Sequence, residues 1–281
     1  MSRKLCVAAI QMCSGPDIGR NLEQAAHLLS RAASSGVDWA VLPENFAALD
    51  ADPGVVMQEA KAIRDWLVAQ ARDLGMGIVG GSMAWPERPD GSLPDGGRAR
   101  ATCWIVNHDG RIAGRYDKIH LFDAQVNDQR GGYRESAIYE AGTVPARVDL
   151  GEWSVQPVIC YDLRFPELFR VWGAPVDWIA APSAFTAVTG ARHWEILCRA
   201  RAIENQCYVV AANQGGLHPG GRETWGHSMI VSPDGEVLAE QRDATAEGGV
   251  MIAEIDREFL ASLRRSIPVW AHRRLPCQSP E

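Results

Sequence analysis

Three residues of the kinds that perform covalent catalysis lie in or just after apolar, strand-like runs: Glu44, Lys118 and Cys160. Glu44 follows the run 39–42, Cys160 closes the run 153–160, and Lys118 lies between aromatic and aliphatic neighbours. A thiol attacks only after it has lost its proton, and a nearby cation favours the thiolate. A carboxylate in an apolar, partly closed site can take that proton and later return it. Together the three side chains predict a cysteine nucleophile, a glutamate base and a lysine that stabilises negative charge.

Each of these residues also has a simpler interpretation when it is taken alone. A glutamate after a proline is typical of a turn, Lys118 can extend its amine to solvent, and Cys160 can be a small core residue. Side chains at the carboxyl ends of strands in an open α/β sheet, however, are where ligands and chemistry collect. A fourth acid, Glu135, lies in the long loop after Lys118, either as a solvated loop residue or as a further member of the site.

The sequence motifs give no support for a bound cofactor or metal ion. The segment 75–80 matches G-x-G-x-x-G, but its glycines end a helix and enter a strand, whereas the dinucleotide motif follows a strand and opens a helix. Neither a Walker A sequence nor a G-x-S-x-G motif occurs. The seven histidines show no paired ligand spacing, and His227 is predicted to be structural. We therefore predict no metal and no cofactor.

Composition and charge exclude several classes of protein. Of the 281 residues, 46% are hydrophobic and 22% are charged, as in an ordinary globular protein. The formal net charge of −7 argues against nucleic-acid binding, which needs a basic face. No run of roughly 18 apolar residues is present that could span a membrane. The seven cysteines are odd in number and lack C-x-x-C spacing, which predicts free thiols in a reducing, cytoplasmic setting.

The elements that must position these residues alternate along the whole chain. Strands are predicted at 5–12, 39–42, 76–83, 102–106, 111–116, 153–160, 178–181 and 207–213, and helices at 21–35, 55–74, 166–172 and 193–204. A meander (226–232, 236–240 and 249–255) and a last helix (257–264) follow. No linker divides the chain, so we expect one α/β domain over residues 1–281, with two sheets and helices outside them. The loops 85–98 and 121–141 are the longest irregular stretches, and such loops are often functional.

The sequence around the three candidate residues closely resembles the nitrilase superfamily of carbon–nitrogen hydrolases, whose triad is Glu-Lys-Cys. The matching blocks, in the family's order and spacing, are Leu42–Phe46, Tyr116–Phe122 and Cys160–Glu167, and the similarity runs from about residue 4 to about residue 274. The resemblance implies a four-layer α-β-β-α sandwich and chemistry through an acyl-thioester without a cofactor. It further implies that the chain dimerises through helices that map to about 166–172 and 192–204.

Further blocks resemble the Nit amidase branch of that superfamily, at 182–186, 189–195, 199–209, 226–231 and 268–274. The last two, with 211–214, are more similar to deaminated glutathione amidases than to the ω-amidases of 2-oxoglutaramate and 2-oxosuccinamate. The reaction implied is hydrolysis of a primary amide of a small carboxylate-bearing substrate to acid and ammonia. An ω-amidase, a nitrilase or N-carbamoyl hydrolase, and an inactive scaffold stay open as alternatives. Ala191 departs from the family's usual proline after Thr-Gly.

The resemblance also implies roles for residues beside the nucleophile. Glu44 is expected to be the base, and Glu135 is expected to orient Lys118 and the bound amide. The tetrahedral oxyanion is expected to be met by Lys118 and by a backbone N–H after the nucleophile, that of Tyr161.

A substrate that carries a carboxylate needs a cation in the pocket. Arg164, four residues after the nucleophile, is the first candidate because a guanidinium binds a carboxylate with two hydrogen bonds. A structural ion pair with Glu167 is the alternative. Further candidate substrate contacts are Tyr133, Thr186 and Arg192. The expected partners are thus a small-molecule amide and a second copy of the chain, with neither nucleic acid nor membrane.

Overall fold

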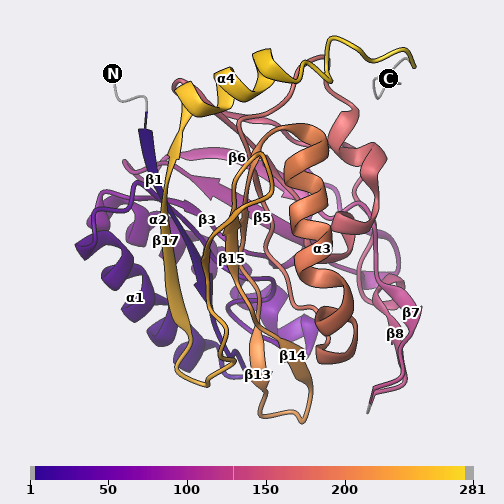
Figure 1. The fold of residues 1–281 in the computed structure, drawn as a ribbon. Helices are drawn as coiled ribbons and strands as arrows, with labels where there is room; N and C mark the ends of the chain where they lie inside the picture. The colour runs from indigo at the N-terminus through magenta and orange to yellow at the C-terminus, as the bar shows by residue number, and fades with distance from the viewer. Residues whose placement is uncertain (1–3, 129, 276–281) are drawn as a thin grey trace.

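Two β-sheets packed face to face form the centre of the computed structural model, which describes residues 4–128 and 130–275 (Figure 1). The first, seven-stranded sheet consists of β1 (Lys4–Gln11), β2 (Trp39–Val41), β3 (Gly77–Val79), β4 (Met83–Trp85), β5 (Arg100–Val106), β6 (Ile112–Asp117) and β17 (Gly249–Asp256). The second, six-stranded sheet consists of β9 (Val148–Leu150), β10 (Trp153–Pro157), β11 (Trp178–Ala180), β12 (Tyr208–Ala211), β15 (Met229–Val231) and β16 (Val237–Glu240).

Helices cover the outer faces of both sheets. They are α1 (Ile18–Ser34) and α2 (Pro53–Leu74) against the first sheet, and α3 (Ala187–Asn205) against the second, while α4 (Arg257–Ser266) follows β17 (Figure 1). The strands β1, β2 and β3 are parallel, and so are β10, β11 and β12. Parallel neighbours need a crossover, usually a helix, which is why the amphipathic runs fall between these strands. The arrangement confirms the α-β-β-α sandwich expected from the sequence.

The alternating side chains of each strand divide the core into layers. In β1, Val7 and Ala9 face the second sheet, whereas Ala8 and Ile10 face the helices α1 and α2. Between the sheets the rings of Trp39 and Trp178 lie 6.5 Å apart. Because both faces of the central strands are buried, these strands read as continuous apolar runs in the sequence.

The motif at 75–80 ends a helix, as predicted. Gly75 caps α2 in the left-handed conformation with φ of +61°, and Gly77 opens β3. A side chain at Gly77 would overlap the Trp39 ring. The glycines therefore serve a helix end and a close packing contact, with no helix following them to hold a pyrophosphate.

The predicted strand 76–83 is wrong, because it is two strands separated by Gly80, Gly81 and Ser82. Gly81 has φ of +59°, and any side chain there would overlap the Pro43 carbonyl. The backbone N–H of Asn45 donates to the Ser82 hydroxyl at 3.1 Å. The interruption thus supports the loop that carries Glu44.

Two other segments differ from the prediction. The predicted helix 166–172 is only a short 3₁₀ turn, η4 (Pro166–Arg170), which follows another, η3 (Cys160–Arg164). The predicted irregular loop 121–141 contains a small hairpin of β7 (Asp123–Gln125) and β8 (Gly132–Arg134) and the turn η2 (Glu135–Ala137). A second hairpin, β13 (Gly215–Leu217) with β14 (Glu223–Trp225), and a turn in the loop 85–98, η1 (Asp95–Gly97), complete the elements.

None of the helices in the described part of the chain is long and apolar enough to cross a membrane. The six described cysteines carry free thiols, and Cys277 lies outside the described residues.

Candidate active site

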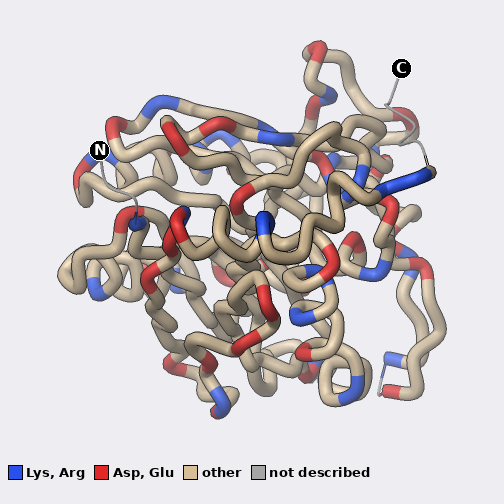
Figure 2. Tube along the Cα trace, turned by 45° about the horizontal axis from the view of Figure 1, so that its top comes forward, with Lys and Arg blue, Asp and Glu red and all other residues tan. Residues whose placement is uncertain are grey.

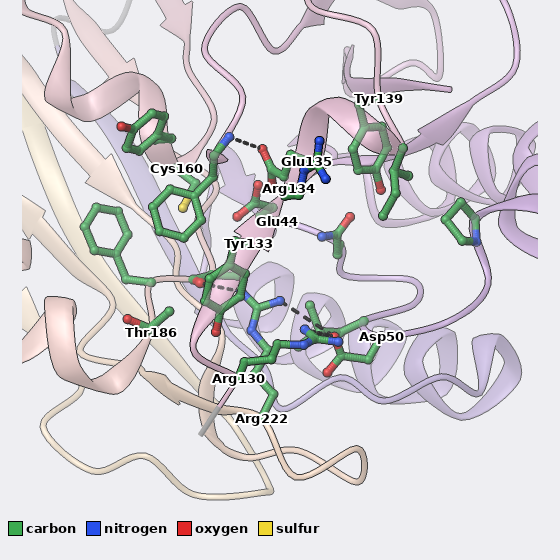
Figure 3. Close-up of a pocket in the computed structure, with 18 of the residues that line it drawn as sticks. Glu44, Asp50, Arg130, Tyr133, Arg134, Glu135, Tyr139, Cys160, Thr186 and Arg222 are labelled. Atoms are coloured by element: carbon green, nitrogen blue, oxygen red, sulfur yellow. Dashed lines mark hydrogen bonds and ion pairs between the residues drawn. The ribbon is translucent and has the colours of Figure 1, made fainter. Parts of the chain in front are cut away.

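A cavity of about 340 Å³ lies at the carboxyl ends of β2, β10 and β11 (Figure 3). Glu44 and Cys160 line it, together with Glu135. Lys118 follows β6 and contacts both glutamates. The tertiary structure therefore brings together all four residues that were expected to carry the chemistry.

Cys160 is the first residue of η3, at a tight turn after β10. Its backbone has φ of +48°, in the left-handed region that non-glycine residues seldom adopt. The Cys160 N–H donates to the Pro182 carbonyl at 2.8 Å. Such strained positions persist only where the surroundings hold them, and they concentrate at functional sites.

Lys118 is enclosed between two carboxylates. Its side chain is 1% exposed, and its Nζ lies 2.8 Å from Glu44 Oε1 and 2.9 Å from Glu135 Oε2. Burial lowers the pKa of Lys118, but the charges of Glu135 and Glu44 outweigh it and hold that pKa well above its usual value. Lys118 is therefore a permanent ammonium beside the thiol.

The thiol itself is not ionised at rest. Burial and the charge of Glu44 raise the pKa of Cys160 well above its usual value, although Lys118 and a hydrogen bond from the Ala184 backbone lower it. The expectation that the lysine favours the thiolate has the right sign, but burial and Glu44 are stronger. For Cys160 to act as a nucleophile, a neighbouring base would therefore have to take the thiol proton.

Glu135 is fixed in place by the turn η2 rather than solvated. Its Oε2 accepts a hydrogen bond of 2.7 Å from the Phe122 N–H, and its Oε1 accepts one of 3.0 Å from Lys118. The interpretation as a solvated loop acid is wrong, because the β7–β8 hairpin folds the loop back onto the lysine.

A buried carboxylate, Asp162, connects the nucleophile turn with the segment that carries the lysine. Its Oδ2 accepts from the Ile159 N–H at 2.9 Å and from the Tyr116 hydroxyl at 2.7 Å. Its Oδ1 accepts from the His120 N–H at 3.0 Å and contacts His120 Nδ1 at 2.8 Å. Since Ile159 precedes Cys160 and the other two partners flank Lys118, Asp162 fixes the spacing between Cys160 and Lys118.

Asp162→Asn is expected to destabilise the protein by about 2–3 kcal/mol, because an amide keeps one acceptor oxygen and points donors at groups that already donate. Urea denaturation measures the loss. The control is Asp149→Asn, whose side chain is 80% exposed and pairs with Arg147 only at 3.7 Å, and which should change stability little. Equal losses in both variants would contradict the connecting role of Asp162.

Three of the four candidate substrate contacts line the cavity: Tyr133, Arg164 and Thr186. Arg164 Nη1 lies 3.1 Å from His193 Nδ1, and its guanidinium lies over the Phe185 ring. This partner replaces the ion pair with Glu167 that was the alternative.

Arg192 is the exception, because it is exposed on α3 and does not line the cavity. The helix turns its buried side, including Trp194 and Cys198, toward the second sheet. At about 100° per residue, a position two before Trp194 points away from that side. The Thr186 hydroxyl caps the start of α3, where it accepts a hydrogen bond from the Thr189 N–H at 3.3 Å.

Sequence reasoning missed four charged residues that line the same cavity: Asp50, Arg130, Arg134 and Arg222. Figure 3 shows Asp50, Arg130 and Arg222 together at one end, with Tyr133 between them and Cys160 in this view, whereas Arg134 lies beside Glu135. Arg222 follows two glycines in the β13–β14 turn, a pattern typical of an exposed loop. Charged residues next to glycines are common in loops, so this pattern could not have identified Arg222 as a cavity residue.

No group of three or more His, Cys, Asp or Glu side chains within residues 4–128 and 130–275 is placed to hold a metal ion. His227 has a structural partner, because its Nδ1 lies 2.9 Å from Glu240 Oε1 and its ring stacks on Trp225. A thiol and two carboxylates line the cavity, and the Lys118 ammonium contacts both carboxylates; groups of these kinds can carry out acyl transfer.

Comparison with known proteins agrees with this geometry. Residues 6–265 match the carbon-nitrogen hydrolase family. A deaminated glutathione amidase of Synechocystis is 38% identical over 274 residues, covering 95% of this chain and 97% of its own, and one of Yersinia enterocolitica is 37% identical over 276 residues, covering 95% and 92%. The crystal structure of Saccharomyces cerevisiae Nit3, a member of branch 10 of the nitrilase superfamily, superposes with a TM-score of 0.82 at 28% identity, covering 98% of each chain.

These matches extend over almost the whole chain and include the segments that supply the thiol, the ammonium and the carboxylates of the cavity. The activity they support is hydrolysis of a carbon–nitrogen bond in an amide. The inactive scaffold is thereby set aside. The chain belongs to the carbon-nitrogen hydrolase family.

Proposed function

We propose that this amidase cleaves deaminated glutathione, with Cys160 as nucleophile, Glu44 as base and Lys118 as the oxyanion-stabilising cation. The observation that carries the proposal is the buried Lys118 ammonium held between Glu44 and Glu135 in the cavity that Cys160 lines. Relatives named deaminated glutathione amidase support the substrate.

In the first half of the proposed reaction, the Cys160 thiol gives its proton to Glu44 as sulfur bonds to the amide carbon. The carbonyl electron pair moves to oxygen, which Lys118 and the Tyr161 N–H stabilise. Tyr161 belongs to the first turn of η3, where backbone N–H groups have no acceptor within the helix. As the tetrahedral intermediate collapses, the C–N bond breaks, nitrogen takes the proton from Glu44, and an acyl-thioester remains.

In the second half, water attacks the thioester carbon while Glu44 accepts one of its protons. The C–S bond then breaks, the acid leaves, and sulfur recovers its proton from Glu44. Glu135 is the positioning residue for Lys118. No cofactor enters either half.

The chemistry of the substrate decides which nitrogen leaves. In deaminated glutathione the cleaved bond is a secondary amide, so the leaving group is the amine of cysteinylglycine. The primary amide and ammonia expected from the sequence apply to the ω-amides instead. Both substrate classes carry a carboxylate on the acyl side, for which Arg164 is the proposed partner, with Tyr133 and Thr186 shaping the adjacent wall.

The test is to incubate the purified protein with deaminated glutathione, 2-oxoglutaramate and an aliphatic nitrile. Release of cysteinylglycine is measured for the first substrate and release of ammonia for the other two. Faster turnover of deaminated glutathione supports the proposal, and faster turnover of 2-oxoglutaramate identifies an ω-amidase. Cleavage of the nitrile alone would overturn the substrate assignment.

Glu135→Gln is expected to lower kcat by about 10- to 100-fold, because it removes a charge-assisted hydrogen bond from Lys118. The charge of Glu135 raises the pKa of Lys118, so its removal lowers that pKa and shifts the alkaline limb of the pH–rate profile to lower pH. Glu254→Gln, at an exposed position paired with Lys4, serves as the control and should leave the profile unchanged. An unchanged alkaline limb in Glu135→Gln would contradict the positioning role.

We propose further that the chain forms one domain, acts as a homodimer and works in the cytoplasm without nucleic acid. Ile196 and Ile203 are 68% and 50% exposed and lie two turns apart on one face of α3, which supports an apolar interface there. In the view of Figure 2, Lys and Arg are interspersed with Asp and Glu among the described residues. Light scattering should give twice the protomer mass of 30.7 kDa, and a monomer mass would exclude the dimer.

A further inference from the structure

We propose that Arg222 is a specificity-determining residue that binds a carboxylate of the substrate at the end of the cavity away from Cys160. The inference rests on the proposed function, since it concerns an anionic substrate of the same cavity. It adds a second cation to Arg164, on a different element and from a part of the chain that no family motif marks.

The β13–β14 hairpin delivers this residue to the cavity. The His218 N–H donates to the Arg222 carbonyl at 2.8 Å, which closes the turn. The Trp225 N–H donates to the Phe185 carbonyl at 2.9 Å, and Thr224 bridges to Thr186, so the hairpin is docked on the segment before α3. Arg222 is therefore held at the cavity wall by backbone contacts on both sides.

Several N–H donors of the Arg222 guanidinium have no hydrogen-bond acceptor among the described residues. The side chain is only 14% exposed, and its Nη2 donates to the Ala184 carbonyl at 3.0 Å. Its Nη1 lies 3.8 Å from Asp50 Oδ1, beyond hydrogen-bond distance. Among the described residues Ala184 is thus the single hydrogen-bond acceptor of a group with five N–H donors. A carboxylate entering the cavity can accept from the remainder.

Asp50 does not neutralise this end of the cavity. Its short contact is with Arg130, whose Nη1 lies 2.7 Å from Asp50 Oδ1. At this end of the first cavity two arginines face one aspartate, while two further acids, Asp128 and Glu223, line an adjoining cavity. The centroid of the Tyr133 ring lies 5.8 Å from the guanidinium carbon of Arg130 and 5.5 Å from that of Arg222. Cation–π contacts hold both cations in place while leaving their N–H edges open to a ligand.

The distribution of charge along the cavity fits an elongated substrate with an anionic end. The end of the cavity with Arg130 and Arg222 attracts a substrate carboxylate, and it lies away from Cys160 and from the carboxylates of Glu44 and Glu135 (Figure 3). A second cavity of about 280 Å³ shares Arg130, Tyr133 and Arg222 with the first, and Asp128 and Glu223 line it as well. The dipeptide leaving group of deaminated glutathione extends roughly 7 Å, and this adjoining space can receive it.

The experiment compares Arg222→Gln with the unchanged protein on three amides. Deaminated glutathione carries a carboxylate at both ends, 2-oxoglutaramate carries one on the acyl side, and pentanamide carries none. We expect kcat/KM for a carboxylate-bearing substrate to fall about 10- to 100-fold, mainly through KM, because a charged hydrogen-bonded pair is lost. For pentanamide the change should stay within about threefold.

Two results would support the proposal and locate the carboxylate. A loss confined to deaminated glutathione places it on the leaving group, and a loss on both anionic substrates places it on the acyl side. Two results would overturn the proposal. An equal loss on pentanamide would mean that Arg222 acts by holding Ala184, and no loss on any substrate would mean that it does not contact substrate.

Controls separate this proposal from the folding of the variant and from the proposed function. Arg111→Gln makes the same charge change at a side chain that is 84% exposed, and it should leave all three values unchanged. Should Arg222→Gln fail to fold, Arg222→Lys keeps the charge without the bidentate fork and should give an intermediate loss with the same substrate dependence.

Should the protein cleave neither anionic amide, the proposed function fails while Arg222 is still testable. Protection of Cys160 from iodoacetamide by glutarate, compared with butyrate, is then measured in both forms. Protection that Arg222→Gln abolishes supports the anion site. Equal protection in both forms, or none in the unchanged protein, overturns it.

Discussion

Replacing Cys160 by alanine is expected to lower kcat for amide hydrolysis by about 10⁴- to 10⁶-fold, the range seen when the nucleophile of a hydrolase is removed. Without the sulfur no acyl-thioester can form, and the ammonium and carboxylates of the cavity can only polarise the amide for direct attack by water. The fold should be retained, because alanine fits the φ of +48° about as well as cysteine does.

Release of the amine product is measured in both forms. Mass spectrometry looks for the acyl-enzyme, which is expected in the unchanged protein and not in Cys160→Ala. Cys6→Ala is the matched control, because its partly exposed thiol does not line the cavity. Its activity should equal that of the unchanged protein. If folded Cys160→Ala kept more than about one hundredth of the activity of the unchanged protein, the thioester mechanism would be contradicted.

Lys118→Met is expected to abolish measurable turnover and also to destabilise the protein by about 3–5 kcal/mol, because it removes one partner of a buried ion cluster. Glu44 and Glu135 would then face each other without the ammonium that now lies 2.8–3.0 Å from their oxygens. Protonation of one carboxylate relieves that repulsion, so the loss of stability should be smaller at pH 5 than at pH 8.

Denaturant unfolding at the two pH values measures this effect, and Lys61→Met, at an exposed position on α2, is the control. The double variant Lys118→Met with Glu135→Gln separates stability from catalysis. Removing one of the two charges should restore part of the stability, but turnover should stay absent because the oxyanion still lacks its cation. Recovery of activity in the double variant would contradict the assigned role of Lys118.

Much of the fold could be predicted because its signals are local. The strands of the central sheets are buried on both faces, so each is an apolar run, and the helices between them carry amphipathic stripes ended by glycine, as at Gly75. The failures also have local causes. A strand was predicted through Gly81, although its positive φ and its contact with Pro43 break the strand, and these depend on a partner far along the chain.

The candidate site divides in the same way. Glu44, Lys118, Glu135 and Cys160 could be found because they stand in motifs or at strand ends. Arg192 was expected in the cavity from its neighbours in sequence, but the orientation of α3 turns it outward. Arg222 was missed because only the docking of the β13–β14 hairpin on residues 183–186 brings it to the cavity.

The sequence by itself determined the family, the order of the main elements and which candidate reacting groups the chain offers. Those properties depend on side-chain chemistry and on periodicity over a few residues. Only the tertiary structure decided that the ammonium lies between two carboxylates, that the thiol rests protonated and that a pair of arginines faces the far end of the cavity. Protonation states and charge fields depend on burial and on distances between residues such as Glu44 and Lys118, which folding brings together from 74 positions apart.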